Sequence, residues 1–401
     1  MEQFLKMKNT VQSYAWGSHS AISALLGLPT PSKEPQAELW MGAHPKAPSQ
    51  VFWQEDWQPL TDILKKHATE ILGKDGTAIY GSNLPYLFKV LAAEAPLSIQ
   101  AHPNKVQAEI GYAKENEMGI ALSAKHRNYR DANHKPECLC ALTPFWALCG
   151  FRPINDIIQQ MGVILSPSFE YLLGPIKEHA DSKGLKTFFK QLMTLTEKER
   201  TALIDHVVKK ANKTPEYSME VKWALLLHEA YSEDIGILSP FFLNLIELAP
   251  NEALFLEAGI LHAYLNGTGV ELMANSDNVL RGGLTSKHID VKELMQVLNF
   301  ESWEKIVQKP QVVGPCQSKF HCPVKEFELS IITINEDDVF TSPVQRGVEI
   351  LLCTEGKTII KDSDRGTTME LSKGSSLLVP ADLKQYTVTG RGVIFKARGP
   401  V

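Results

Sequence analysis

The chain has 401 residues, of which 44% are hydrophobic and 22% charged, and this composition is typical of a globular protein of two or three domains rather than a disordered or fibrous one. Its 41 basic and 46 acidic residues give a net charge of -5 without any basic run, so we expect no nucleic-acid partner. Every apolar run is shorter than the ~20 residues that a membrane-spanning helix needs, so we also expect no membrane partner.

The first residues and the cysteines indicate a cytoplasmic location. Residues 1–6 carry an acid at once and lack the basic and apolar regions of a secretory signal, so we expect a cytoplasmic protein. The six cysteines are not arranged as CxxC pairs, and in a cytoplasmic chain we expect them to be reduced and buried rather than disulfide-bonded or bound to zinc.

In chain order, residues 10–152 have short β-branched and aromatic runs between frequent Gly and Pro, which predicts strands and turns. From residue 154 to about 232, Gly and Pro thin out and amphipathic spacing predicts helices. Thr196 and Glu199 fit a capping box there. Strand-like sequence returns after Pro240. We therefore expect a mainly β protein with an inserted α-helical domain.

Further along the chain, a helix is predicted from Val291 to about Leu298, and alternating runs from about 327 to 397 predict strands. A Gly-turn-Pro pattern at Gly374 and Pro380 is typical of a cupin motif. Where that motif would place its His, this chain has Gln385, so we expect no second metal site there.

Polar residues line one face of two predicted strands. Ser98, Gln100 and His102 alternate with apolar residues, so a strand places all three on one side. Lys135 and Glu137 share a face in the same way. By this parity Cys138 and Cys140 point away from Glu137, which indicates that these thiols are core residues.

A third segment resembles the second cupin motif, with a turn at Gly259 followed by His262 and then Asn266. The first cupin motif is present in altered form at residues 100–102. The resemblance brings together a two-nitrogen, two-oxygen set that suits a borderline divalent ion, zinc above all. Its members are Gln100, His102, Glu137 and His262.

The chain resembles the type I mannose-6-phosphate isomerase family of zinc-dependent cupin enzymes. The similar stretches occur in order along the chain, at residues 14–18, 37–45, 100–105, 133–137, 259–264 and 275–287. The resemblance implies two cupin-like (jelly-roll) β-barrels and one Zn²⁺ per chain. It also implies a catalytic domain of residues 1–152 and 233–310, an inserted helical domain of 153–232, and a C-terminal cupin-like domain of 311–401 without metal.

The same resemblance implies roles for further residues. It makes Arg281 catalytic and places Lys135 and Glu271 in the pocket, where the chemistry leaves either of these two as the base that removes a proton from carbon. Ser98, Lys89 and Lys287 are candidates to bind the phosphate. Candidates to close over the sugar are Trp16, Trp40 and Tyr264.

The expected function is aldose-ketose isomerisation of a small sugar phosphate, mannose 6-phosphate to fructose 6-phosphate, through a cis-enediolate and by a monomer. Two alternatives compete with it. An iron-dependent oxygenase would need open coordination positions, and four protein ligands leave few. A non-catalytic sugar-binding cupin would not need Lys135 or Arg281 beside the metal.

Overall fold

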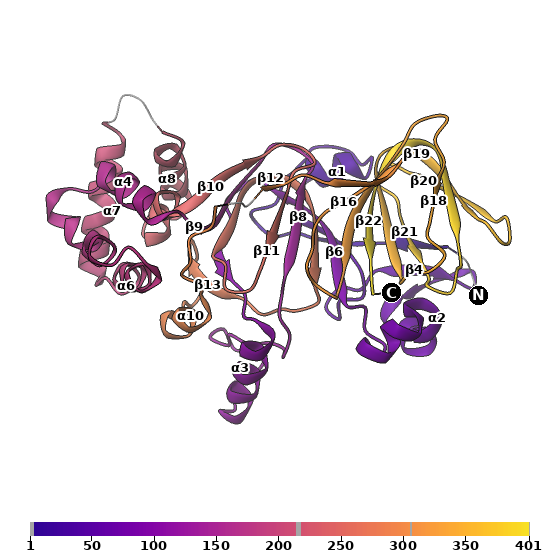
Figure 1. Ribbon diagram of the computed structural model, residues 1–401, viewed down its shortest axis with the longest axis horizontal. Coiled ribbons are helices and arrows are strands. Elements are labelled where there is room, and N and C mark those ends of the chain that lie inside the picture. The colour runs from indigo at the N-terminus through magenta and orange to yellow at the C-terminus, as the bar shows by residue number, and fades with distance from the viewer. Residues whose placement is uncertain (1–3, 214–217, 305–306, 401) are drawn as a thin grey trace.

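The computed structural model describes residues 4–213, 218–304 and 307–400. The first three residues, on which the prediction of a leaderless start partly rests, lie outside that range. The protein is mainly β with helices. Figure 1 shows an elongated molecule with a group of helices at one end and strands through the middle and the other end. None of the described helices is long and apolar enough to cross a membrane.

The first sheet has 11 strands among the described residues. They are β2 (Thr10–Gln12), β3 (Glu38–Met41), β6 (Tyr86–Ala93), β7 (Ile99–Ala101), β8 (Glu137–Ala141), β9 (Phe145–Phe151), β10 (Leu243–Leu248), β11 (Ala253–Leu256), β12 (His262–Ala274), β13 (Leu280–Gly283) and β14 (Val307–Gln308). The 13-residue strand β12 is central, since it pairs antiparallel with β6, β7, β8 and β9.

The second sheet also has 11 strands in the described part of the chain. They are β1 (Leu5–Lys8), β4 (Gln50–Trp53), β5 (Asp56–Pro59), β15 (Gln311–Gly314), β16 (Gln317–Lys319), β17 (Glu328–Ile334), β18 (Phe340–Thr341), β19 (Glu349–Asp362), β20 (Thr368–Ser372), β21 (Ser376–Val379) and β22 (Tyr386–Arg398). Strand β1 pairs with both β21 and β4, so this sheet combines strands from the two ends of the chain.

Helical structure fills the segment between β9 and β10, as predicted. It comprises α4 (Ile154–Ile164), η1 (Pro167–Leu173), α5 (Gly174–Glu178), α6 (Ser182–Met193), α7 (Glu197–Ala211), α8 (Met219–Ala230), η2 (Ile235–Leu238) and α9 (Ser239–Phe242). The capping box is confirmed, because the backbone amide of Glu199 donates to Thr196 Oγ1 over 3.3 Å and the Glu199 carboxylate accepts from the Thr196 amide. Apolar faces of these helices share one core with β9 and β10.

The other helices are α1 (Ala21–Leu25), α2 (Leu60–Tyr80), α3 (Lys105–Glu117) and α10 (Val291–Val297). The last confirms the predicted helix. We did not predict α2 or α3, which lie in the region read as strands and turns. The backbone angles at His67 and Gly73 within α2 are not helical, and in the sequence the glycines of this segment indicate turns. Helix α3 leaves Val106 and Ile110 exposed, so it lacks a clear amphipathic pattern.

A second core joins the two sheets. Phe88 and Leu272 of the first sheet belong to the same buried cluster as Ile350 and Phe395 of the second. The six cysteines are all free and five are buried, which confirms the expectation of reduced core thiols.

Charged residues are buried within the second sheet. Glu349, fully buried, lies 3.3 Å from the Lys396 ammonium and 3.7 Å from the Arg346 guanidinium, and it accepts a 2.8 Å hydrogen bond from the Tyr386 hydroxyl. The Glu349 carboxylate thus compensates two buried cations. In the same sheet Gln385, which stands where the motif would have its histidine, donates to the Ser342 carbonyl.

We predict that Glu349→Gln lowers the free energy of unfolding by about 3 kcal/mol, because it leaves two buried cations without their counter-charge. Denaturant unfolding measures the change. The control is Glu370→Gln, which removes the partner of Lys357 at an exposed pair 2.7 Å apart and is expected to change the free energy by less than about 1 kcal/mol. Equal losses in the two variants would contradict the prediction.

Candidate active site and metal centre

Strand β12 positions the site. At its first residue, His262 lies opposite Gln100 of β7, and further along Glu271 lies opposite Lys89 of β6. Gln100 is also opposite Arg281 of β13. Four strands therefore present these side chains to one region, although their sequence positions are far apart.

Two histidines and one carboxylate converge in the interior. His102, Glu137 and His262 have ligand atoms that all lie within 4.8 Å of one another, and each side chain is buried. The Nε2 atom of each histidine is 3.5 Å from a Glu137 oxygen. Among the described residues, no other such group of His, Cys, Asp and Glu is present.

The protonation of the two rings suits a metal. His102 Nδ1 contacts the Asn278 carbonyl at 2.7 Å and His262 Nδ1 contacts the Ile260 carbonyl at 2.9 Å. A carbonyl only accepts, so Nδ1 of each ring carries a proton, and in a neutral ring of this tautomer Nε2 presents a lone pair. Both Nε2 atoms are buried and have no hydrogen-bond partner. Burial, followed by nearby Lys135, lowers the pKa of His102 to about 4, so the ring is neutral near pH 7.

Glu137 stays ionised in this cluster. Burial opposes its charge, yet Lys135 and the histidines hold the pKa of Glu137 well below its usual range. The Lys135 ammonium lies 2.7 Å from the carboxylate. Two imidazole nitrogens without a hydrogen-bond partner and one ionised carboxylate are a donor set that fits zinc. Gln100, beside them across the strand pair, can add an amide oxygen.

A cavity of about 540 Å³ opens beside this cluster. With Trp16 and Trp40 left aside, eleven side chains were predicted for the site. Nine of them line this cavity, and the other two, His102 and His262, contact Glu137 in its wall. The nine are Lys89, Ser98, Gln100, Lys135, Glu137, Tyr264, Glu271, Arg281 and Lys287. The sequence-predicted residues are therefore together in the structure.

One wall of the cavity is a buried network around Lys89. Its ammonium lies 3.0 Å from Glu271 and 3.3 Å from Glu38. The Tyr264 hydroxyl donates to Glu271 over 2.9 Å. Burial works against the charge on Lys89, but the two carboxylates raise its pKa overall. For Glu271 the effect of burial has the opposite sign: it is the main cause of a raised pKa. The raised pKa makes this carboxylate a stronger base than an exposed one.

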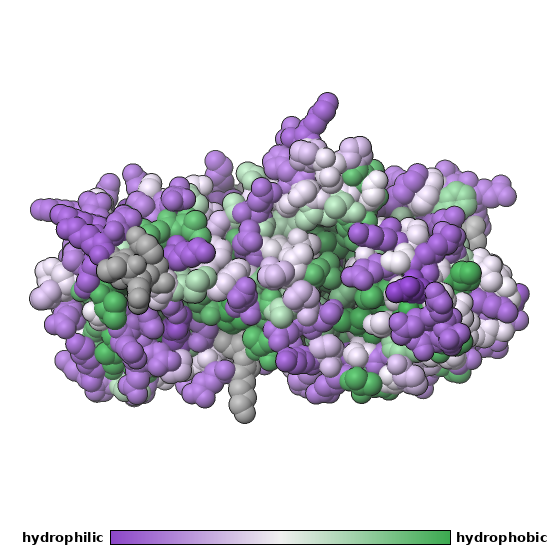
Figure 2. All heavy atoms as spheres, turned by 90° about the horizontal axis from the view of Figure 1, so that it is seen from above, coloured by the Kyte–Doolittle hydropathy of each residue, from purple (hydrophilic) through white to green (hydrophobic). Residues whose placement is uncertain are grey.

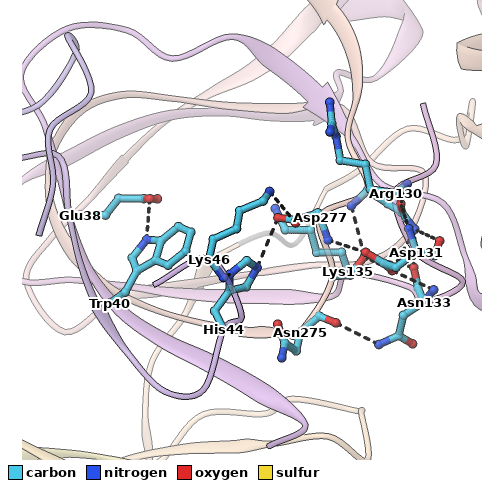
Figure 3. A network of polar contacts seen from close by, with 12 residues as sticks. Glu38, Trp40, His44, Lys46, Arg130, Asp131, Asn133, Lys135, Asn275 and Asp277 are labelled. Carbon is cyan, nitrogen blue, oxygen red and sulfur yellow. Dashed lines mark hydrogen bonds and ion pairs between the residues drawn. The ribbon is translucent and has the colours of Figure 1, made fainter. Parts of the chain in front are cut away.

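Lys89 is therefore paired with two carboxylates. A lysine that serves mainly to bind phosphate would instead have its ammonium unpaired in the cavity. Trp40 also differs from expectation. Its indole nitrogen donates to Glu38 over 2.8 Å (Figure 3), and Trp40 is not among the residues that line the cavity. Trp16 and Tyr264 do line the cavity. Glu38 was missed because it lies on a strand whose residues are all buried and gives no spacing signal.

The opposite end of the cavity is cationic. Burial and then Arg130 lower the pKa of the Arg281 guanidinium, and burial followed by Arg281 and Arg130 lowers the pKa of Lys287. Three cations thus lie near enough to repel one another. We had not singled out Arg130, which lies in a loop without a motif. Its side chain extends away from Asp131 in Figure 3 and donates to the Leu122 carbonyl over 2.8 Å.

The comparisons with known proteins agree with this site. Residues 4–154 match the family model of phosphomannose isomerase type I, catalytic domain. The mannose-6-phosphate isomerase of Escherichia coli is 39% identical over 393 residues, covering 96% of this chain and 97% of that protein. The human mannose-6-phosphate isomerase is 35% identical over 409 residues, covering 93% and 92%.

A solved structure shows the same fold. Mannose 6-phosphate isomerase from Salmonella typhimurium, bound to the substrate fructose 6-phosphate and zinc, superposes with a TM-score of 0.92 at 36% identity, and the match covers 100% of both chains. Likeness at this level extends over the sheets, the helices and the site together. The chain therefore belongs to the type I phosphomannose isomerase family.

Proposed function

We propose that this chain, which acts as a zinc-dependent isomerase of mannose 6-phosphate and fructose 6-phosphate, holds its zinc with four side chains and moves the proton with a buried carboxylate. The ligands are Gln100, His102, Glu137 and His262. The observation that carries the assignment is the pair of buried, unpartnered histidine Nε2 atoms facing Glu137 in the wall of the cavity. When bound, zinc supplies Lewis acidity to the sugar oxygens.

Glu271 is the residue that we assign as the base on carbon. The Lys135 ammonium is 2.7 Å from the Glu137 carboxylate, so its position is set by a proposed metal ligand. The Glu271 carboxylate lines the cavity, and Lys89 and Tyr264 fix its orientation through one oxygen each. Glu271 removes the proton from C2 of mannose 6-phosphate and returns it to C1, while the hydroxyl proton of O2 passes to O1. Lys135 donates hydrogen bonds to the oxygens of the enediolate.

Arg281 and Lys287 form the anion-binding end, with Ser98 beside them and Arg130 behind them. Mutual repulsion of these cations is relieved by a dianionic phosphate. Arg281 is the nearest of them to the metal ligands, since it lies opposite Gln100 across β7 and β13. Its planar guanidinium is also placed to stabilise charge that develops on the enediolate. A non-catalytic sugar binder would leave the paired Lys89 and Glu271 without a role.

The finer architecture belongs to the same proposal. We propose that the two sheets are cupin-like barrels and that residues 153–232 are an inserted domain between 1–152 and 233–310. Residues 311–401 then supply most of a second barrel, completed by β1, β4 and β5. A cytoplasmic monomer without a nucleic-acid partner remains our expectation. An assay of fructose 6-phosphate formation with zinc-loaded and chelator-treated protein tests the proposed function.

We predict one zinc per chain, because the second sheet presents a Glu349 ion cluster rather than histidine ligands. His262→Ala removes one nitrogen donor and is expected to lose the metal while the cores remain folded. Elemental analysis after gel filtration measures the zinc, and circular dichroism checks the fold. Two tightly bound zinc ions per chain, or one that persists in His262→Ala, would contradict the assignment.

We predict that Arg281→Ala retains zinc but lowers kcat on the order of 100-fold or more, because a preorganised charge at the enediolate is lost. Arg281→Lys is expected to restore little, since an ammonium lacks the planar fork of donors. Steady-state kinetics and zinc content measure both effects. Near-normal kcat in either variant would leave Arg281 with a binding role only.

We predict that fructose 6-phosphate converted in deuterated water gives mannose 6-phosphate that carries solvent deuterium at C2, with partial retention of the original hydrogen. The proton rests on Glu271 between its removal and its return, and water competes for it there. Mass spectrometry of the product measures the label. Glu271→Gln abolishes the exchange. In the control Lys135→Met, exchange persists at reduced turnover.

The absence of solvent label in a product shown to form would indicate a hydride shift and would remove the base from the mechanism. Exchange that persists in Glu271→Gln but disappears in Lys135→Met would assign the base to Lys135 instead. Zinc content is measured in both variants, so that a lost metal is not mistaken for a lost base.

A further inference from the structure

Two loops are joined by a dense hydrogen-bond cluster behind the metal ligands. We define the 131–278 clasp as Asp131, Asn133, Ser276 and Asn278. The Asp131 carboxylate accepts from the Asp277 amide over 2.7 Å, from the Ser276 hydroxyl over 2.8 Å and from the Asn133 amide over 2.9 Å. Figure 3 shows Asp131 between Asn133 and Asp277. One carboxylate therefore ties both loops together.

Asn278 is the centre of the clasp and is fully buried. Its side-chain NH₂ donates to the carbonyls of Asp131 and Asn133, each over 2.8 Å. Its side-chain oxygen accepts from the amides of Arg130 and Asp131 over 2.7 and 3.2 Å. Because both polar groups of the side chain are hydrogen-bonded, the position of the Asn278 backbone is restricted.

That backbone contacts a metal ligand. The Asn278 carbonyl accepts a hydrogen bond from His102 Nδ1–H, with 2.7 Å between N and O, and this bond orients the ring so that Nε2 faces Glu137. The same clasp lies close in the chain to two further site residues. Asn133 precedes Glu137 by four positions, and Arg281 follows Asn278 by three. The clasp therefore lies just before strands β8 and β13, which carry Glu137 and Arg281.

We propose that Asn278 and Asp131 are positioning residues that determine the zinc affinity of the site by fixing the tautomer and orientation of His102. The inference rests on the proposed zinc site and adds residues that touch neither the metal ligand set nor the substrate through their side chains. A hydrogen bond from a metal-bound histidine to such a partner typically changes metal affinity by about 10- to 100-fold.

The experiment compares three variants of the zinc-loaded protein. Asn278→Asp keeps the size of the side chain but turns a carboxylate toward two carbonyls and Asp131. Asp131→Asn keeps the size of the side chain and removes the charge of a carboxylate that accepts four hydrogen bonds. The control is Asp277→Asn in the same loop, because the Asp277 carboxylate pairs with Lys46 at 2.7 Å and His44 at 3.5 Å, outside the clasp (Figure 3).

Zinc dissociation constants are measured by competition with a chromophoric chelator. We expect Asn278→Asp and Asp131→Asn to raise the constant by about 10- to 100-fold, and the control to change it by less than about 3-fold. Nitrogen-15 spectra of the metal-free protein report the His102 tautomer, and the signal is identified by its loss in His102→Gln. The Nδ1-protonated form is expected in the wild type and control, and a mixture of tautomers in the clasp variants.

The outcomes separate this inference from the proposed function. Wild-type protein that binds no zinc would overturn the zinc site itself. A wild type that binds zinc, together with clasp variants of unchanged affinity and tautomer, would overturn only the positioning role. An equal loss of affinity in Asp277→Asn and Asp131→Asn would also overturn it, since the effect would then belong to the loop as a whole. If Asn278→Asp does not fold, Asp131→Asn decides the question.

Discussion

The buried contact of two imidazoles with one carboxylate is the constraint on which the rest of the site depends. His102 and His262 turn unpartnered Nε2 atoms toward Glu137, in a place that water does not reach. Buried lone pairs without a donor are costly unless a cation takes them. The burial that depresses the pKa of His102 also keeps it a ligand, and Lys135 keeps Glu137 ionised. A divalent metal satisfies all of these groups at once.

Charge is distributed unevenly along the cavity. At the metal end the lysines are each paired, Lys135 with Glu137 and Lys89 with Glu271. Around Arg281, burial and then Arg130 lower the pKa of the guanidinium, so the cations there repel one another. In the proposed binding mode the phosphate lies beside these cations and away from the carboxylates. The overall charge of -5 plays no part, because the attraction is local.

Local patterns predicted local structure, and the failures have a physical cause. The helices after residue 154 and the cap at Thr196 follow from spacing over one or two turns. The pairing of β1 with β21 could not be read, because it joins residues more than 350 positions apart. Site residues were found where motifs named them. Glu38 and Arg130 could not be recognised, because the residues they interact with are distant in the sequence. Asn278 lies within a stretch that resembles the family, but the sequence does not indicate that its carbonyl accepts a hydrogen bond from His102.

The central claim is a single zinc ion among the four proposed ligands. Anomalous diffraction from crystals of the zinc-loaded protein, recorded on both sides of the zinc absorption edge, tests it directly. The account predicts one anomalous peak within bonding distance of His102 Nε2, His262 Nε2, the Glu137 carboxylate and the Gln100 amide oxygen. A peak at another position, a second peak of similar height within the sheet that holds Glu349, or no peak beside Glu137 would contradict it.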